Sequence, residues 1–335
     1  MNSNKNQAGW LSSPKEPALD ADMPICDPHH HLWNHPTSQY LLDDLHEDTG
    51  SAHNITKTVF VECGSEYRSE GPESMRPVGE TEFVAELARQ SESMSGATIA
   101  GIVGFADLTL GEKVQEVLEA HISAGEGRFK GIRHASAWHE DASIHNAHTN
   151  PTADLFSRSS FLAGIRILRK LNLTFDAWLY HPQISDLSSL ASANPNVFML
   201  LDHLGGPLGI GPYKNKRDEV RNVWRPQIKE LALNPNVFVK LGGIGMSIYG
   251  SGWHKLPQAP RSQDLANAWK EDVLFCIEHF GVKRCMFESN FPVDKRGCSY
   301  TVLWNAFQRM IEGASEDEKR SLFFETANDF YSLEI

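Results

Sequence analysis

A short apolar run near the start of the chain is followed directly by residues 27–33, which read Asp-Pro-His-His-His-Leu-Trp. Alternate side chains of a β-strand lie on one face. This spacing predicts that Asp27, His29 and His31 project together, while His30 points away. Two imidazoles at one strand end can form half of a metal site or half of a general acid–base pair. The segment therefore predicts a functional site at the end of the first strand.

Short apolar or β-branched runs recur along the chain and alternate with amphipathic stretches. Eight runs predict strands, at 24–26, 58–63, 99–104, 129–134, 174–179, 197–203, 237–241 and 285–288. Helices are predicted at 80–90, 111–124, 157–171, 184–194, 224–233, 262–280, 300–313 and 316–330. The last helix begins with a capping box from Ser315 to Glu318.

The alternation of strands and helices predicts parallel strand pairing and an α/β fold. Eight such units favour a single (β/α)8 TIM barrel. A doubly wound open sheet is the alternative, but the first strand lacks the Gly-rich phosphate loop that many such folds carry. We expect the barrel to span residues 23–335, after a polar and loosely packed arm at 1–22. Three loops that follow strands, 135–156, 204–223 and 243–263, are long enough to cover a site.

The charge and cysteine content limit the partners that we expect. A formal net charge of −12 argues against nucleic-acid and anionic-membrane partners, which need a basic face. No apolar run approaches the roughly 18 residues of a membrane span, and the first 22 residues lack the apolar core of a secretory signal. The five scattered cysteines predict reduced thiols in a cytoplasmic protein. The expected partner is a small-molecule substrate, and a homodimer is only the default for this fold.

Functional groups of a barrel lie at the C-terminal ends of its strands. The predicted strand ends carry many polar and titratable residues: His29, His31, Glu62, Tyr67, Arg68, Arg133, His134, His181, Asp202, His203, Lys240, Glu288, Asn290 and Asp294. Each one alone has a structural explanation, such as an ion pair at the rim. Their convergence at one end of the barrel favours a functional site.

Three motifs resemble those of the amidohydrolase superfamily. They are the strand-one Asp-x-His-x-His-x-Trp, the Asp-His-Leu-Gly-Gly-Pro of 202–207 and the Ser-Asn-Phe-Pro of 289–292. The likeness is to the amidohydrolase-2 branch, which includes sugar-lactone and pyrone-dicarboxylate lactonases and some decarboxylases. It runs in order from residue 24 to residue 330 and includes 129–134 and 239–243.

The resemblance implies roles for the histidines. His29 and His31 match a strand-one pair that binds a divalent metal ion in many members and the substrate in metal-independent ones. His203 matches the strand-six histidine, and His181 lies near the end of strand five, where metal-binding members also place a histidine. His29, His31 and His203 would then hold one zinc or manganese ion. The other alternative is a metal-independent site in which Arg, Tyr and His polarise the carbonyl group.

The strand-eight position departs from the family pattern. The family usually has an aspartate where this chain has Asn290, and an amide is no base at neutral pH. Glu288, two residues earlier on the same face, and Asp294, four residues later, are the candidate replacements. Either could instead have a structural role, Glu288 in a buried ion pair and Asp294 beside the basic residues that follow it. In a third alternative, Asn290 orients a water molecule and a histidine takes the proton.

The predicted function is hydrolysis of a small lactone or a related cyclic ester by a carboxylic-ester hydrolase. His29, His31 and His203 would polarise the carbonyl group, while Asn290 with Glu288 or Asp294 would activate water. Further residues are predicted to bind or enclose the substrate: Tyr67, Arg68, Arg133, His134, His181, Trp33, Trp138 and Trp178. The alternatives are a metal-dependent non-oxidative decarboxylase and a catalytically inactive small-molecule binding protein.

Overall fold

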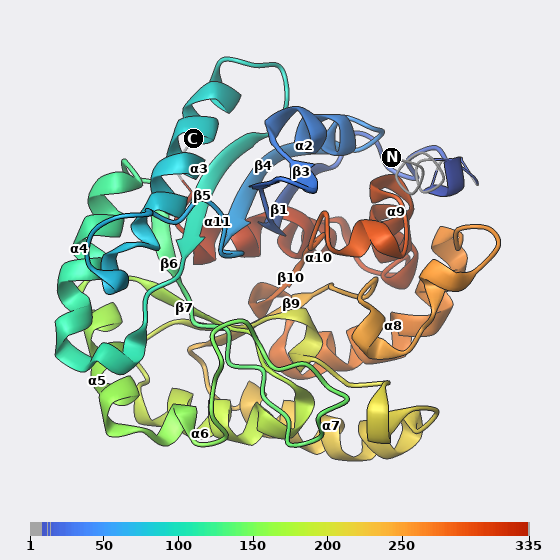
Figure 1. Ribbon diagram of the computed structural model, residues 1–335. Helices are drawn as coiled ribbons and strands as arrows, with labels where there is room; N and C mark the ends of the chain where they lie inside the picture. Colours follow the sequence, from blue (N-terminus) through green and yellow to red (C-terminus); the bar gives the residue numbers. More distant parts are fainter. Residues whose placement is uncertain (1–8, 12, 14, 334–335) are drawn as a thin grey trace.

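Eight parallel strands form the centre of the molecule in a computed structural model that describes residues 9–11, 13 and 15–333 (Figure 1). In order around the sheet they are β1 (Pro24–His30), β4 (Asn54–Val61), β5 (Thr98–Gly104), β6 (Phe129–Arg133), β7 (Thr174–Ala177), β8 (Met199–Leu201), β9 (Val237–Leu241) and β10 (Cys285–Phe287). A parallel bridge between His30 and Phe291 joins the two ends of the sheet. The predicted (β/α)8 barrel is confirmed.

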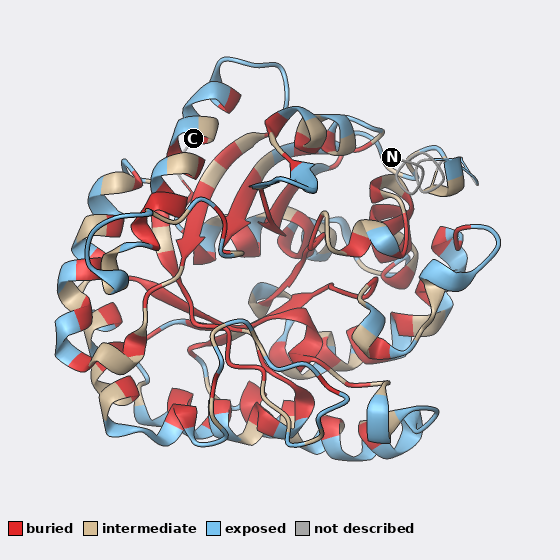
Figure 2. Ribbon diagram, in the orientation of Figure 1, coloured by how far each residue is buried: buried red, intermediate tan, exposed pale blue. Residues whose placement is uncertain are grey.

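Helices surround the strands, with their outer faces exposed and the strands buried (Figure 2). They are α2 (Leu42–Thr49), α3 (Val78–Glu92), α4 (Val114–Ala124), α5 (Ser159–Lys170), α6 (Ile184–Ala193), α7 (Arg217–Ala232), α8 (Ser262–Phe280), α9 (Tyr300–Met310), α10 (Glu316–Arg320) and α11 (Thr326–Phe330). The predicted capping box before α10 is confirmed, since Ser315 and Glu318 bond reciprocally. A π-helical turn, Ser321–Glu325, interrupts the predicted last helix.

Two elements near the start of the chain were not predicted. They are α2 and a hairpin of β2 (Trp33–His35) and β3 (Ser38–Tyr40). Neither has the continuous apolar pattern of a core strand or a long amphipathic helix, because the hairpin is largely exposed and α2 is short and acidic.

The C-terminal segment closes the end of the barrel where the strands begin. The carbonyl groups of Ser332 and Leu333 accept hydrogen bonds from Lys130 at 3.1 Å and Lys57 at 3.0 Å. An apolar cluster joins this segment to alternate strand residues: Cys26, Val59, Val61, Val103, Leu200, Met286, Ala327, Phe330, Tyr331 and Leu333. This end of the interior is therefore filled by apolar side chains, and the Tyr331 hydroxyl, which donates to Asp176, joins it to the polar groups at the other end.

The described part of the predicted arm contacts the barrel. The Leu19 N–H donates to Asn305 Oδ1 at 2.9 Å, and the Ser262 N–H donates to Glu16 Oε1 at 3.0 Å, so these residues are less loosely held than we expected. Residues 1–8, 12 and 14 of the arm lie outside the described residues. All five cysteines are free thiols, as predicted. In the described ranges we find no helix with the length and apolar character of a membrane span.

Candidate active site

The carboxylate of Glu288 lies between two imidazoles at the C-terminal end of the barrel. Its Oε2 is 2.7 Å from His29 Nδ1, and its Oε1 is 2.6 Å from His203 Nδ1. The His29 and His203 rings lie 4.5 Å apart between centroids, and all three side chains are buried. A carboxylate can only accept here, so each Nδ1 carries the hydrogen and each Nε2 keeps a lone pair. Glu288 thus orients both rings. The alternative prediction, in which Glu288 forms a buried ion pair with an arginine or a lysine, is wrong.

A second polar chain runs from His31 through Asn290 to Asp294. His31 Nδ1 lies 2.7 Å from the carbonyl oxygen of Val61 and must donate to it. His31 Nε2 lies 3.3 Å from the Asn290 amide, whose other end is 2.8 Å from Asp294 Oδ1. Asp294 Oδ2 accepts from the Gly245 N–H at 2.7 Å. The structural alternative, in which Asp294 pairs with Lys295 or Arg296, is wrong: Lys295 binds Asp48, and Asp294 forms no ion pair with either residue in the described part of the chain.

The Asn290 amide lies between His31 and Asp294. Its Oδ1 faces His31 Nε2, and its Nδ2 donates to Asp294 Oδ1 at 2.8 Å. Burial, the largest effect, raises the pKa of Asp294 to about 7. Asp294 is therefore the member of this chain that can gain or lose a proton near neutral pH.

Lys240 and Arg133 place two cations against His29. Lys240 Nζ lies 2.9 Å from Asp176 Oδ2 and 3.2 Å from both Asp202 Oδ1 and His29 Nδ1. Arg133 Nη1 lies 3.3 Å from His29 Nε2. Burial and the Lys240 ammonium hold the pKa of His29 well below its usual range. His29 is therefore a neutral donor and acceptor in this cluster.

Carboxylates outnumber cations in the cluster. The anionic side chains are Glu62, Asp176, Asp202 and Glu288, and the permanent cations are Arg133 and Lys240. Burial alone would raise the pKa of Glu62, but Arg133 and then His148 outweigh it and hold that pKa at about 2. Two negative charges thus remain in excess before any histidine is protonated, an arrangement that attracts a further cation.

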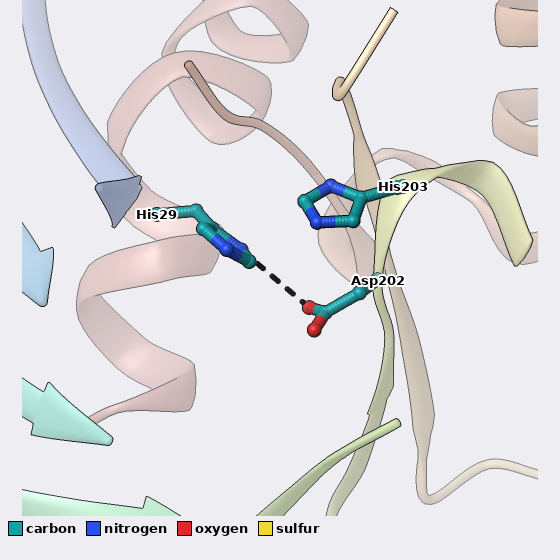
Figure 3. A group of neighbouring side chains, drawn as sticks. All are labelled: His29, Asp202 and His203. Carbon is teal, nitrogen blue, oxygen red and sulfur yellow. Dashed lines mark ion pairs between the residues drawn. The ribbon is translucent and has the colours of Figure 1, made fainter. Parts of the chain in front are cut away.

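His29, Asp202 and His203 form a donor set that fits a divalent metal ion (Figure 3). One ligand atom from each lies within 4.8 Å of the others. The Asp202 side chain is fully buried, and its closest cationic partner among the described residues is Lys240, 3.2 Å from Oδ1. Two imidazoles and a carboxylate suit zinc. Two of the three predicted metal ligands, His29 and His203, belong to this set. The third member is Asp202, whereas the prediction named His31.

Local backbone geometry holds these side chains in place. His203 and Asn290 both have a φ of 54°, which non-glycine residues rarely adopt. A Cβ on Gly243, whose φ is 68°, would lie 2.6 Å from the ring of His203. The Tyr249 hydroxyl also donates to the carbonyl oxygen of His203 at 2.8 Å. The loop after β9 thus packs directly against His203, and only glycine fits at this contact.

Three predicted substrate-binding residues lie outside this cluster. Arg68 pairs with Glu82 on α3 and is partly exposed. His134 accepts from the Leu108 N–H at 3.3 Å, and His181 accepts from the Leu208 N–H at 3.3 Å. Each of these imidazoles thus accepts a hydrogen bond from a backbone N–H group.

Asp27 does not project with the histidines, so that prediction is wrong. Its carboxylate accepts from the Tyr300 hydroxyl at 2.9 Å and from the Ser289 N–H at 2.9 Å. The pairing of β1 with β4 shifts register between Asp27 and His30, and a bulge of this kind changes the face on which side chains lie. His30 points away as predicted, with its ring 6.0 Å from that of Phe60.

Sequence reasoning left several cluster members without a site role. Asp202 stood in a quoted motif beside His203, and its position behind a strand was the signal. Glu62 and Lys240 stand at predicted strand ends, and the convergence of those ends is the only signal for both. Asp176 lies within a predicted strand, and His148 lies in a long loop with no periodic pattern.

Comparison with known proteins places the chain in a family. The sequence profile of the amidohydrolase family matches residues 26–333. The chain belongs to the amidohydrolase family. An uncharacterised protein of Sinorhizobium fredii, y4mH, is 31% identical over 93% of this chain and 100% of its own length. An L-fucono-1,5-lactonase of Burkholderia multivorans is 25% identical over 76% of this chain and 77% of its own length.

Solved structures of other amidohydrolases share the barrel. Two crystal structures of an amidohydrolase from Burkholderia multivorans, one with bound HEPES and one with bound zinc, have a TM-score of 0.71. They are 22% identical to this amidohydrolase over 92% of its chain and 99% of theirs.

Proposed function

We propose that this amidohydrolase is a carboxylic-ester hydrolase that opens a small lactone, with sugar-acid lactones as its substrate class. The observation that carries the proposal is the bridging of His29 and His203 by Glu288, which directs both Nε2 atoms away from the carboxylate and leaves His29 Nε2 facing the Arg133 guanidinium. Preorganised positive groups of this kind stabilise the oxyanion that forms when water attacks an ester carbonyl. The similarity to an L-fucono-1,5-lactonase supports the lactone class.

The residues of the cluster have separable roles in the proposed reaction. Arg133, 3.3 Å from His29 Nε2, would donate to the developing oxyanion, and Lys240 would add a second positive charge below it. Asp294 would accept the proton of the attacking water, and the hydrogen bond from Asn290 would hold its carboxyl group in place. A pKa of about 7 suits a general base near neutral pH, whereas the pKa of Glu288, held at about 2 by His203 and His29 against the effect of burial, does not.

We further propose that His29, Asp202 and His203 hold one divalent metal ion, zinc before manganese. When bound, such an ion polarises a carbonyl oxygen and lowers the pKa of a coordinated water molecule. Glu288 would serve this set by fixing the tautomer of both imidazoles, as carboxylates do behind metal-bound histidines. Lys240, 3.2 Å from Asp202 Oδ1, is the internal competitor for that carboxylate.

Two aromatic residues border the site on the side of the loops. The Trp178 ring lies 4.9 Å from that of His203 and is partly exposed. The Tyr67 hydroxyl is buried and has no hydrogen-bond partner among the described residues. We propose that Trp178 forms a wall of the substrate site and that Tyr67 binds a substrate hydroxyl.

A lactone panel read with a pH indicator tests the proposal. It would include L-fucono-1,5-lactone, δ-valerolactone and dihydrocoumarin, each assayed with protein as purified, after chelation and after zinc addition. Acid release by wild-type protein is expected. Release of carbon dioxide from aromatic acids without acid release from any lactone would contradict it, and activity in neither assay would favour a binding protein.

Metal content provides a separate readout. Asp202→Asn should lower the zinc retained per chain after dialysis, while Asp317→Asn, at a side chain 93% exposed, should not. Equal zinc retention by both variants and wild type would contradict the proposed ligand set.

A further inference from the structure

One imidazole reaches the cluster from a loop instead of a strand end. His148 lies in the segment between β6 and α5, and its Nε2 is 3.1 Å from Glu62 Oε2. The His148 side chain is 48% exposed, while that of Glu62 is 0% exposed. His148 therefore connects the buried cluster directly with solvent.

The loop holds this imidazole at a defined place. The Ala147 N–H donates to the carbonyl oxygen of Ala137 at 2.8 Å, and the Thr149 hydroxyl donates to that of Ala135. The residues on both sides of His148 are thus hydrogen-bonded to the segment that follows β6. These hydrogen bonds fix the backbone on both sides of His148, so its contact with Glu62 depends on the fold of the loop.

Glu62 links His148 to the centre of the site. Its Oε1 accepts from Arg133 Nε at 2.8 Å, and Arg133 in turn lies 3.3 Å from His29 Nε2. The charged and titratable groups that act on His148 are Glu62, Arg133, Glu80 and His134. The hydrogen bond to Glu62 has the largest effect and raises the pKa of His148.

We propose that His148 is the general acid that protonates the leaving oxygen of the lactone. This inference rests on the proposed lactonase function. The water oxygen bonds to the carbonyl carbon, and its proton goes to Asp294. The bond between that carbon and the ring oxygen then breaks, and the ring oxygen keeps the electron pair and takes a proton from the His148 imidazolium, whose Nε2 hydrogen stays hydrogen-bonded to Glu62. Solvent returns a proton to His148 through its exposed side.

The dependence of the rate on the leaving group distinguishes a general acid from a residue with a structural role. δ-Valerolactone releases an alkoxide, which needs a proton, whereas dihydrocoumarin releases a phenoxide, which leaves without one. His148→Gln should lower kcat/KM for δ-valerolactone by about 100-fold and for dihydrocoumarin by less than about 3-fold. In wild type, the rate on δ-valerolactone should fall as pH rises through the raised pKa of His148, and this limb should vanish in the variant.

Two further variants make the test specific. His148→Arg keeps a cation beside Glu62 but cannot release a proton near neutral pH, so it should be as slow as His148→Gln on δ-valerolactone. His145→Gln, at an exposed histidine of the same loop, should leave both rates unchanged. Thermal unfolding of each variant reports whether it folds.

Each outcome bears on the proposal. Equal losses on both lactones, or recovery of δ-valerolactone hydrolysis in His148→Arg, would overturn the general-acid role and leave the lactonase function standing. Failure of wild-type protein to open any lactone would overturn both.

Discussion

The surroundings of Glu288 and Asp294 differ sharply, although the two carboxylates are six residues apart and both 0% exposed. Glu288 faces two imidazoles, and their effect exceeds that of burial and holds its pKa at about 2. Asp294 faces one backbone N–H and one amide, and burial prevails and raises its pKa to about 7. The same residue chemistry thus yields a permanent anion at one position and a titrating acid at the other.

This difference accounts for the asparagine at the strand-eight position. An aspartate there could combine a fixed negative charge with proton transfer. In this chain Glu288 provides the charge and Asp294 the titratable proton, while Asn290 connects Asp294 to His31. In the proposed mechanism, Asp294 would therefore be the base of a site that has an amide at position 290.

Removal of the Glu288 charge should have the largest effect. Glu288→Gln takes the shared acceptor from two imidazoles, and the loss of one such partner typically costs about 10–100-fold in activity. We expect kcat/KM for the best lactone to fall by about 1,000-fold, measured by acid release. Glu316→Gln, at a side chain 71% exposed, is the matched control and should retain wild-type activity. A loss below about 10-fold in Glu288→Gln would show that Glu288 does not orient the histidines.

Removal of the titrating acid should have the next largest effect. Asp294→Asn keeps the size of the side chain but cannot accept a proton, and loss of a general base typically costs about 100-fold or more. We expect kcat to fall by about 100-fold at pH 8 with KM changed by less than about 3-fold. A variant with raised KM and unchanged kcat would assign Asp294 to substrate binding.

The two carboxylates should also change stability with pH in opposite directions. The pKa of Glu288 lies below the ordinary value of about 4.3, so its stabilisation is present above that pH and is lost as pH falls towards 2. The pKa of Asp294 lies above about 3.9, so its contribution is present below that pH and is lost as pH rises through about 7. Asp294→Asn should therefore gain stability over wild type, by about 2 kcal/mol between pH 5 and pH 7.

Urea unfolding at these two pH values measures the difference. If the gap between Asp294→Asn and wild type stays constant from pH 5 to pH 7, Asp294 does not titrate in this range.

Restoration of an aspartate at position 290 should have the smallest effect. Asn290→Asp places a second carboxylate 2.8 Å from Asp294 and should raise the pKa of Asp294 further. We expect the added negative charge to strengthen zinc retention by about 10-fold, measured by competition with a chelator. Zinc retention equal to wild type would argue that position 290 lies too far from the ion to matter.

Much of the fold could be predicted from the sequence because the strands are apolar runs that the barrel buries. The periodic signal fails for α2 and for the β2–β3 hairpin, which bury little. It also fails for Asp27, since a register shift in β1 reverses the face on which its side chain lies.

Prediction of the site was uneven for a related reason. His29, His203 and Glu288 follow strands, so their convergence could be anticipated. Which acceptor each imidazole uses depends on atomic distances that no spacing rule contains. His148 belongs to a loop, and its contact with Glu62 depends on bonds from its neighbours to residues 135 and 137. Loop conformation of this kind leaves no pattern in the sequence.

The pH dependence of kcat/KM tests most directly whether the two strand-eight carboxylates have separate roles. It would be measured from pH 5 to pH 9 on the best lactone, for wild type and Asp294→Asn. We predict that the wild-type profile has a rising limb at about pH 7, as Asp294 loses its proton, besides the falling limb of His148, and that the rising limb is absent in the variant. An unchanged limb in Asp294→Asn would show that another group takes the proton from water, and would contradict the account.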